Sequence, residues 1–432
     1  MEDLSKPFSQ NIIWRSLHYL LNFILTIFIA RHFGSVMSGH LFYLMNNGAL
    51  VILILGCCLE SAIVFFSAEN NIAASRIFHL SVVWMLVIGI FLFLFSYTIG
   101  DYNNDFLETF RQKDSLLYII GTVMLTYMSS FFHARKDFIT PNLVSLIINV
   151  ILIVILSLSA KAGFLSGETF ISIYLVSFLI QGLVMLLFLL KQNKDFRIFQ
   201  LPNSVEMSRI FSFLSLVIIT NVLSFLCYRA DYWFVRFFCS DNELGNYIQV
   251  SKLVQLFFIF PGILATVIFP ITSAGQGDKI STIMPTLTRI IFLVYSCLCL
   301  LLVIIGAWLF PFVFGKSFSL MYNCFLFYIP GIIGFSGLYL YTSFYAGSNR
   351  VMINVKGCLL ALAVMLAGDW FFIPRYGITA AAAMSSCAYL VYFIFVVRIF
   401  MREFNVSLTT MLLIKKEDLT FITNKLIHST KR

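Results

Sequence analysis

The sequence predicts an all-α polytopic membrane protein. Of its 432 residues, 60% are hydrophobic and only 11% are charged, and the mean hydropathy is +0.93. Soluble proteins carry about 25% charged residues, so this composition excludes a water-exposed globular fold. The 48 Phe and 19 Tyr residues suit contact with lipid tails and with the membrane interface.

Apolar segments of sufficient length recur along the whole chain. A helix needs about 20 mostly apolar residues to cross the hydrocarbon core. Gly, Pro and small polar clusters separate such segments here. The sequence therefore predicts about 12 transmembrane helices, at residues 10–31, 41–66, 77–99, 115–133, 142–160, 170–190, 209–237, 246–272, 287–310, 320–345, 354–374 and 378–401.

The distribution of Lys and Arg favours one orientation. With a cytoplasmic N-terminus, most of the 29 cations fall in inner loops and in the C-terminal tail. Both termini are therefore expected to be cytoplasmic, and the first apolar segment is expected to be retained rather than cleaved as a signal. The net charge of +9 follows this topology, so we expect no nucleic-acid partner. The nine Cys residues form no CxxC pair, so they predict small core side chains and no metal site.

The longest inner loop, at about 191–208, predicts a division into two halves. We expect an N-terminal six-helix bundle at residues 1–195 and a C-terminal six-helix bundle at residues 196–402. Residues 403–432 form a basic cytoplasmic tail. Two interpretations of this tail remain open, an amphipathic helix on the inner surface and a disordered segment.

The two halves resemble each other in sequence. The segments ARKDFITPN at 134–142 and AGSNRVMIN at 346–354 both run from Ala to Asn after an apolar stretch. Residues 30–43 and 235–247 form a second pair at a similar offset. Six helices in each half give the halves one orientation, as in parallel transporter repeats, and the bundles are expected to be pseudo-symmetric. Chance similarity between apolar stretches is the alternative.

Four motifs occur in order along the chain: IARHFG at 29–34 with GCCLES at 56–61, YRADYWFV at 228–235 with LGNY at 244–247, LFPFVFGK at 309–316, and IPRYGITAAA at 373–382. Together they resemble the polysaccharide and O-antigen flippases of the MOP superfamily, which also contains the MATE exporters. Two positions depart from the family pattern: Asp369 stands where an Asn is usual, and Ala380 where a Gly is usual. The resemblance therefore assigns no role to Asp369.

This resemblance implies a MATE-like fold of two bundles around a central cavity. It implies a transporter rather than an enzyme, located in the bacterial cytoplasmic membrane. The implied cargo is an undecaprenyl-pyrophosphate-linked oligosaccharide for O-antigen, lipopolysaccharide or another surface polysaccharide. The implied partners are this lipid-linked substrate and membrane lipids, with a polysaccharide polymerase and a chain-length regulator as further candidates.

In members of the superfamily, spans one, two, seven and eight line the cavity. A lipid pyrophosphate is anionic, so cations and hydrogen-bonding groups on these spans are the candidate substrate-binding residues. Each also has a structural interpretation, as an interfacial anchor, an ion-pair partner or a helix–helix contact. They are Arg15, His18 and Asn22, spaced to share one face of the first span, Arg229 on the seventh, and Lys252 with Gln255 on the eighth.

Three acidic residues within the predicted spans are candidates for ion coupling: Glu60, Asp231 and Asp369. Each could bind H⁺ or Na⁺, and each could instead pair with a cation for structural reasons. Residues 34–40 have the glycine spacing of a phosphate-binding loop but lack its Lys and Ser/Thr, so no ATPase is expected. The expected energy source is a H⁺ or Na⁺ gradient, with no other cofactor.

Two other functional classes are compatible with a polytopic membrane protein: a multidrug exporter, and a membrane enzyme such as a polysaccharide polymerase or an acyltransferase. A multidrug exporter of the same superfamily should have an acidic cavity, and the cations on spans one, seven and eight disfavour it. A membrane-bound polysaccharide polymerase should carry a large outer loop, which the sequence lacks. An acyltransferase should carry an HxxxxD pair, and residues 133–137 (HARKD) lack its spacing.

Overall fold

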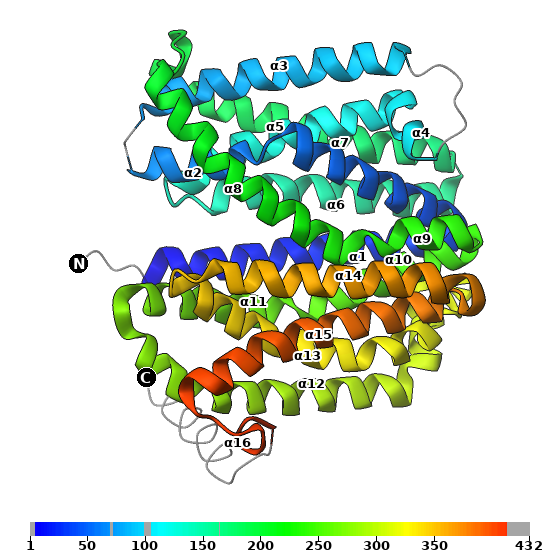
Figure 1. Cartoon of the computed structure of the whole chain (residues 1–432). Helices are drawn as coiled ribbons and strands as arrows, with labels where there is room; N and C mark the ends of the chain where they lie inside the picture. Colours follow the sequence, from blue (N-terminus) through cyan, green and yellow to red (C-terminus); the bar gives the residue numbers. More distant parts are fainter. Residues whose placement is uncertain (1–4, 70–71, 99–104, 164, 413–432) are drawn as a thin grey trace. The chain divides into compact units, whose positions relative to one another are not determined.

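The computed structural model describes residues 5–69, 72–98, 105–163 and 165–412, and within these ranges it is helical with no strand (Figure 1). The chain forms two compact units, Met1–Phe225 and Leu226–Arg432. The first unit contains α1 (Ser5–Leu55), α2 (Leu59–Glu69), α3 (Ala74–Thr98), α4 (Asp105–Arg111), α5 (Lys113–Ala134), α6 (Ile139–Ala162), α7 (Gly167–Gln192), a 3₁₀ turn (Lys194–Arg197) and most of α8 (Ser204–Arg229).

The second unit begins near the end of α8. In it, α15 packs against both α13 and α14, and α13 also contacts α11 and α12. Its elements are α9 (Asp231–Phe238), α10 (Asp241–Phe257), α11 (Ile259–Ile271), a π turn (Thr272–Gln276), α12 (Gly277–Phe314), a 3₁₀ turn (Lys316–Phe318), α13 (Met321–Gly347), α14 (Val351–Tyr376), α15 (Ile378–Phe404) and α16 (Leu408–Leu412).

Ten helical stretches in the described residues are long and apolar enough to cross a membrane. Two of them, Ser16–Leu55 with 40 residues and Ile259–Phe314 with 56 residues, far exceed the length of one crossing. Each contains a glycine with positive φ, Gly34 at 72° and Gly275 at 79°, where the helix direction changes. Because both stretches reverse at these glycines, the structure agrees with the predicted total of about 12 spans.

By contacts, α8 up to Phe225 belongs to the first unit. Arg76 on α3 donates to Glu206 near the start of α8 at 2.8 Å, and the rings of Phe65 and Phe213 stack with centroids 4.9 Å apart. The division of the repeats at 195/196 is a separate expectation and stays a prediction. The predicted tail begins at the end of α15; α16 packs on α12, and residues 413–432 lie outside the described part.

Matching turns occur at the two places where the sequence suggests a repeat. After α5, Lys136 has φ 62°, and Asp137 then caps α6 by accepting hydrogen bonds from the amides of Ile139 and Thr140 at 3.0 Å. After α13, Asn349 has φ 58° before α14 begins. A left-handed residue thus ends the fourth span and the tenth span alike.

Glycines also bring corresponding helices together in the two units. A Cβ on Gly121 of α5 would lie 2.4 Å from the backbone nitrogen of Leu179 on α7. A Cβ on Gly331 of α13 would lie 2.7 Å from the Cα of Ser386 on α15. The fourth and sixth spans therefore pack backbone to backbone, as the tenth and twelfth do, which is how membrane helices gain close contact.

The outer surfaces carry large apolar side chains. On α12, residues four apart form a stripe in which each side chain is more than half exposed: Leu300, Ile304, Trp308 and Phe312. Such a stripe would be unfavourable in water, and it matches a face that contacts lipid tails.

We predict that Gly121→Ala lowers the stability of the purified protein by about 1–3 kcal/mol, because the new methyl group must separate two helix backbones. Gly89→Ala is the matched control, since the nearest atom to its Cβ would be 3.9 Å away. Thermal unfolding in detergent measures both variants. Equal melting temperatures for Gly121→Ala and the unmodified protein would contradict this packing.

Candidate functional site

The first group of interest lies where α8 meets α10 in the second unit. Arg229, the last residue of α8, donates to Gln255 Oε1 at 2.9 Å and to the hydroxyl of Tyr232 at 3.2 Å. Its guanidinium also lies over the Tyr232 ring, 5.3 Å from the centroid. Lys252, one turn before Gln255 on α10, is close enough to Arg229 for their positive charges to interact. We call Arg229, Lys252 and Gln255 the cation cluster.

Local sequence explains why these helices face each other. Ser240 and Glu243 form a capping box at the start of α10, with the Ser240 amide donating to Glu243 Oε2 at 2.9 Å. Arg236 near the end of α9 forms an ion pair with Asp241 across the same turn. These contacts fix a tight reversal, so that α10 runs back along α9 and presents Lys252 and Gln255 toward Arg229.

The second group surrounds Asp231, only two residues after Arg229. Its side chain is 1% exposed, and its Oδ2 accepts hydrogen bonds from Tyr247 at 2.5 Å and from Ser385 at 3.0 Å. Tyr328 in turn donates to the Tyr247 hydroxyl at 2.7 Å. Four helices, α9, α10, α13 and α15, therefore meet at one carboxylate.

A second acid joins this group from α14. Asp369 is fully buried, and its charge interacts with that of Asp231. Within the described residues, neither of its carboxylate oxygens has a hydrogen-bond partner, and nor does Asp231 Oδ1. Two carboxylates with three unsatisfied oxygens in a buried site repel each other unless a cation or a proton neutralises them. We call Asp231, Asp369, Tyr247 and Ser385 the carboxylate cluster.

The chemistry of this cluster limits what it could hold. Carboxylate and hydroxyl oxygens are hard ligands, which suit alkali and alkaline-earth ions rather than thiophilic metals. No group of three or more His, Cys, Asp or Glu side chains in the described residues could hold a metal ion. Two carboxylates with neutral hydroxyls fit a proton or a small monovalent cation.

A break in the seventh span separates the two clusters. Helix α8 ends at Arg229, Ala230 stands between the helices, and α9 begins at Asp231. Both side chains contact α10, but at different levels: Arg229 donates to Gln255, whereas Asp231 accepts from Tyr247, about two turns earlier, and from Ser385 on α15. They remain close enough for the positive charge of Arg229 to stabilise the Asp231 carboxylate.

In the first unit, the described side chains of α1 and α6 form a polar chain. Asn22 Nδ2 lies 2.7 Å from His18 Nε2 on α1, and Asn149 on α6 donates to Asn22 Oδ1 at 2.8 Å. Arg15 lies on the same helix, but its side chain is outside the described part of the structure. Asn149, only 4% exposed, is a partner that sequence reasoning missed; its signal is an isolated amide within an otherwise apolar span.

Glu60 belongs to the first unit, whereas the other two acids belong to the second. It is the second residue of α2, directly after the helix break at 56–58. Tyr127 supports this break by donating to the carbonyl of Gly56 at 2.7 Å. Of the three predicted coupling acids, the structure therefore brings together Asp231 and Asp369 within one unit.

Sequence reasoning also missed the hydroxyls of Tyr247, Tyr328 and Ser385. Tyr247 belongs to the LGNY motif at 244–247, so the motif marked it without revealing its role. No sequence pattern marks Tyr328 or Ser385 as a site residue, because Tyr and Ser are common within membrane helices. Only the fold shows that they converge on Asp231.

Comparison with protein families identifies the chain. A family model described as polysaccharide biosynthesis protein matches residues 8–276, more than half of the sequence. The chain belongs to the polysaccharide biosynthesis protein family. The match includes the whole cation cluster and Asp231, as well as the polar chain of α1. Comparison with curated protein sequences gave no significant match.

Solved structures share the fold of this family member at low sequence identity. The lipid II flippase MurJ, in an inward-closed conformation, has a TM-score of 0.70 at 14% identity, covering 98% of this chain and 93% of MurJ. An inward-facing multidrug-resistance MATE transporter of the MOP superfamily also scores 0.70, at 12% identity, covering 90% and 94%. A MOP superfamily transporter from Pyrococcus furiosus scores 0.62 at 13% identity, covering 93% and 94%. The predicted MOP fold is thereby confirmed.

We predict that Asp369→Asn raises the stability of the purified protein in alkaline, Na⁺-free buffer, where both acids are ionised, by roughly 1–4 kcal/mol, because it removes one of two interacting buried charges without changing volume. Asp241→Asn is the control, since Asp241 is an exposed acid paired with Arg236. Thermal unfolding again gives the measurement. Strong destabilisation by Asp369→Asn would contradict this prediction, because it would mean that the Asp369 carboxylate makes favourable contacts in the folded protein.

Proposed function

We propose that the protein is a flippase for undecaprenyl-pyrophosphate-linked oligosaccharides. It moves the repeat units of O-antigen or another surface polysaccharide from the inner to the outer leaflet of a bacterial cytoplasmic membrane. Both termini are cytoplasmic in this proposal. The cation cluster carries the argument: Arg229 and Lys252 bring two basic side chains together within apolar spans, an arrangement that suits an anion such as a pyrophosphate.

The geometry suggests how the substrate is held. Arg229 offers a planar guanidinium that suits phosphate oxygens, and Lys252 offers a second positive charge from the facing helix. Gln255 keeps the guanidinium in place through its 2.9 Å hydrogen bond. His18 and Asn22 supply neutral hydrogen-bonding groups suited to sugar hydroxyls. The substrate would exchange its hydration shell for these contacts.

We further propose that a H⁺ or Na⁺ gradient drives transport through the carboxylate cluster. A cation bound between Asp231 and Asp369 removes their repulsion and weakens the attraction between Asp231 and Arg229. Arg229 is then freed to bind the pyrophosphate more strongly. Glu60 is a secondary candidate in the first unit. A polysaccharide polymerase and a chain-length regulator would use the flipped product.

A MATE-like exporter of organic cations is the second candidate. The MATE transporters among the structural neighbours and the buried acids of the carboxylate cluster favour it, because a cationic drug could pair with those acids. The cation cluster argues against it, because Arg229 and Lys252 would repel the same drug. The two candidates therefore make opposite predictions about substrate charge.

The first test of the flippase is the double variant Arg229→Gln/Lys252→Gln in proteoliposomes with a labelled polyprenyl-pyrophosphate oligosaccharide. Each charge-assisted hydrogen bond contributes about 1.5–3 kcal/mol, so we expect transport at low substrate concentration to fall more than tenfold. Arg236→Gln is the control, because Arg236 is already paired with Asp241. Unchanged transport by the double variant would contradict the proposal, and efflux of organic cations without oligosaccharide transport would favour the exporter.

The second test concerns the energy source. We expect oligosaccharide transport by the unmodified protein to stop when ionophores collapse the H⁺ and Na⁺ gradients together, and to resume when only the coupling ion is restored. In Asp231→Asn and Asp369→Asn variants, the rate should no longer respond to that gradient. Full transport by the unmodified protein without either gradient would rule out ion coupling.

A further inference from the structure

A groove of about 380 Å³ lies on the second unit, on a face of α15 beside α14. Its lining residues on α15 recur at positions 391, 394, 395, 398, 399 and 402, the spacing of one helix face, and Leu360 of α14 completes it. Val391, Ile394, Phe395 and Ile399 make most of the wall apolar. The two positions toward the end of α15 are Arg398 and Arg402.

The two arginines are available to a ligand. Both are exposed, and within the described residues neither has a hydrogen-bond or ion-pair partner. The neighbouring acid, Glu403, is already engaged, because it accepts from Arg350 at 2.6 Å and from Tyr345 at 3.2 Å. One turn apart on the helix, the guanidinium groups can both reach one phosphate.

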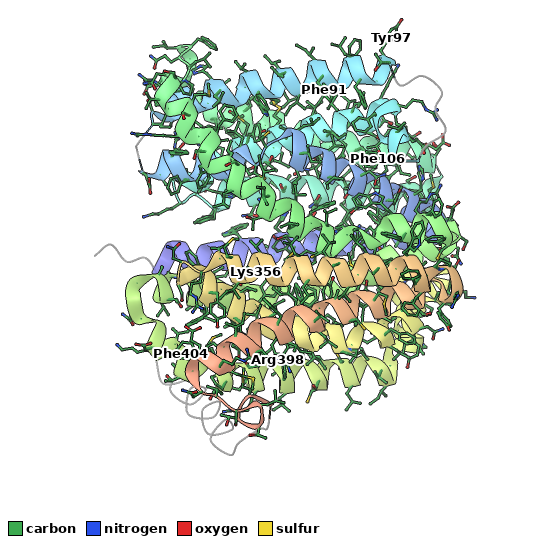
Figure 2. All side chains as sticks on the ribbon, viewed as in Figure 1. Phe91, Tyr97, Phe106, Lys356, Arg398 and Phe404 are labelled. Carbon is green, nitrogen blue, oxygen red and sulfur yellow. The ribbon has the colours of Figure 1, made fainter. Side chains whose placement is uncertain are left out.

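The helix packing explains why a groove forms here. Gly357 lets α14 approach α15 so closely that a Cβ would lie 2.4 Å from the Tyr392 ring, and Tyr392 donates to the carbonyl of Asn354 at 2.9 Å. The start of α14 therefore lies beside the end of α15. Figure 2 shows Lys356 and Arg398 toward the same end of this unit as Phe404, so Lys356 adds a third exposed cation there.

We propose that this groove binds an anionic phospholipid of the inner leaflet. Its phosphate lies between Arg398 and Arg402, and one acyl chain follows the apolar wall from Ile399 toward Leu360. Basic pockets between membrane helices on the cytoplasmic side are suited to anionic head groups. The proposed topology places this end of α15 on that side.

Charge and size favour a phospholipid over two other occupants. The C-terminal segment beyond the described residues, 413–432, carries more Lys and Arg than acids, so the arginines would repel it. A groove of about 380 Å³ is near the small end of the range for ligand pockets, about 300–1,000 Å³, and holds one acyl chain rather than a long polyprenyl tail. No residue of the cation cluster lines the groove, so this site is separate from the proposed substrate site.

The test is binding of phosphatidylglycerol and phosphatidylethanolamine to the purified full-length protein, measured by native mass spectrometry. We expect phosphatidylglycerol to be preferred, and Arg398→Gln/Arg402→Gln to weaken its binding roughly 30-fold. Ile394→Trp, which fills the apolar part, should also displace the lipid while leaving the melting temperature unchanged. Arg375→Gln is the control, an exposed arginine at the opposite end of α14.

Three results would overturn the proposal: equal binding of the two phospholipids, full retention of phosphatidylglycerol by the double variant, or stronger binding of undecaprenyl phosphate than of phosphatidylglycerol at this groove. The readout is lipid binding and does not require transport. Failure of this proposal would therefore leave the flippase proposal standing, and failure of transport would leave this one standing.

Discussion

The burial of Asp231 within a membrane bundle is the constraint on which the second unit depends. A charged side chain at the centre of a membrane helix costs about 2.5–3.5 kcal/mol on insertion scales, so it persists only with partners. Tyr247 and Ser385 supply hydrogen bonds, and Tyr328 orients Tyr247. These partners come from three other helices, so the same contacts that satisfy the carboxylate also set the register of α9, α10, α13 and α15.

The spacing of Arg229 and Asp231 gives this constraint a functional consequence. Residues two apart on a helix point to different sides, so Arg229 reaches Gln255 while Asp231 enters the bundle interior. Their charges still interact. In the proposed mechanism, a change in the charge of the carboxylate cluster alters how tightly Arg229 is held and therefore its availability to an anion. Coupling of this kind would need only a small local rearrangement within one unit.

The sequence was sufficient for the fold because membrane insertion depends on composition and segment length. Apolar runs, glycines and the Asp137 turn follow from local chemistry, and the resemblance supplied the superfamily. The site was only partly predictable. Arg229 and Gln255 were recognised as unusual within apolar segments, yet their mutual hydrogen bond depends on how α10 folds back along α9. Asp231 and Asp369 are 138 positions apart, so no local pattern could show that they meet.

The two units share helix packing, but their described polar groups differ. Glycine contacts join the fourth and sixth spans in one unit and the tenth and twelfth in the other, so the repeat preserves the scaffold. The described part of the polar chain on α1 and α6 consists of His18, Asn22 and Asn149, whereas the second unit holds both the cation cluster and the carboxylate cluster. Under the proposed function, the amides would suit sugars of varied structure, and the basic side chains would suit the pyrophosphate of the lipid carrier. Divergence of the repeat would then let one unit adapt to the sugar while the other retains the common chemistry of the carrier.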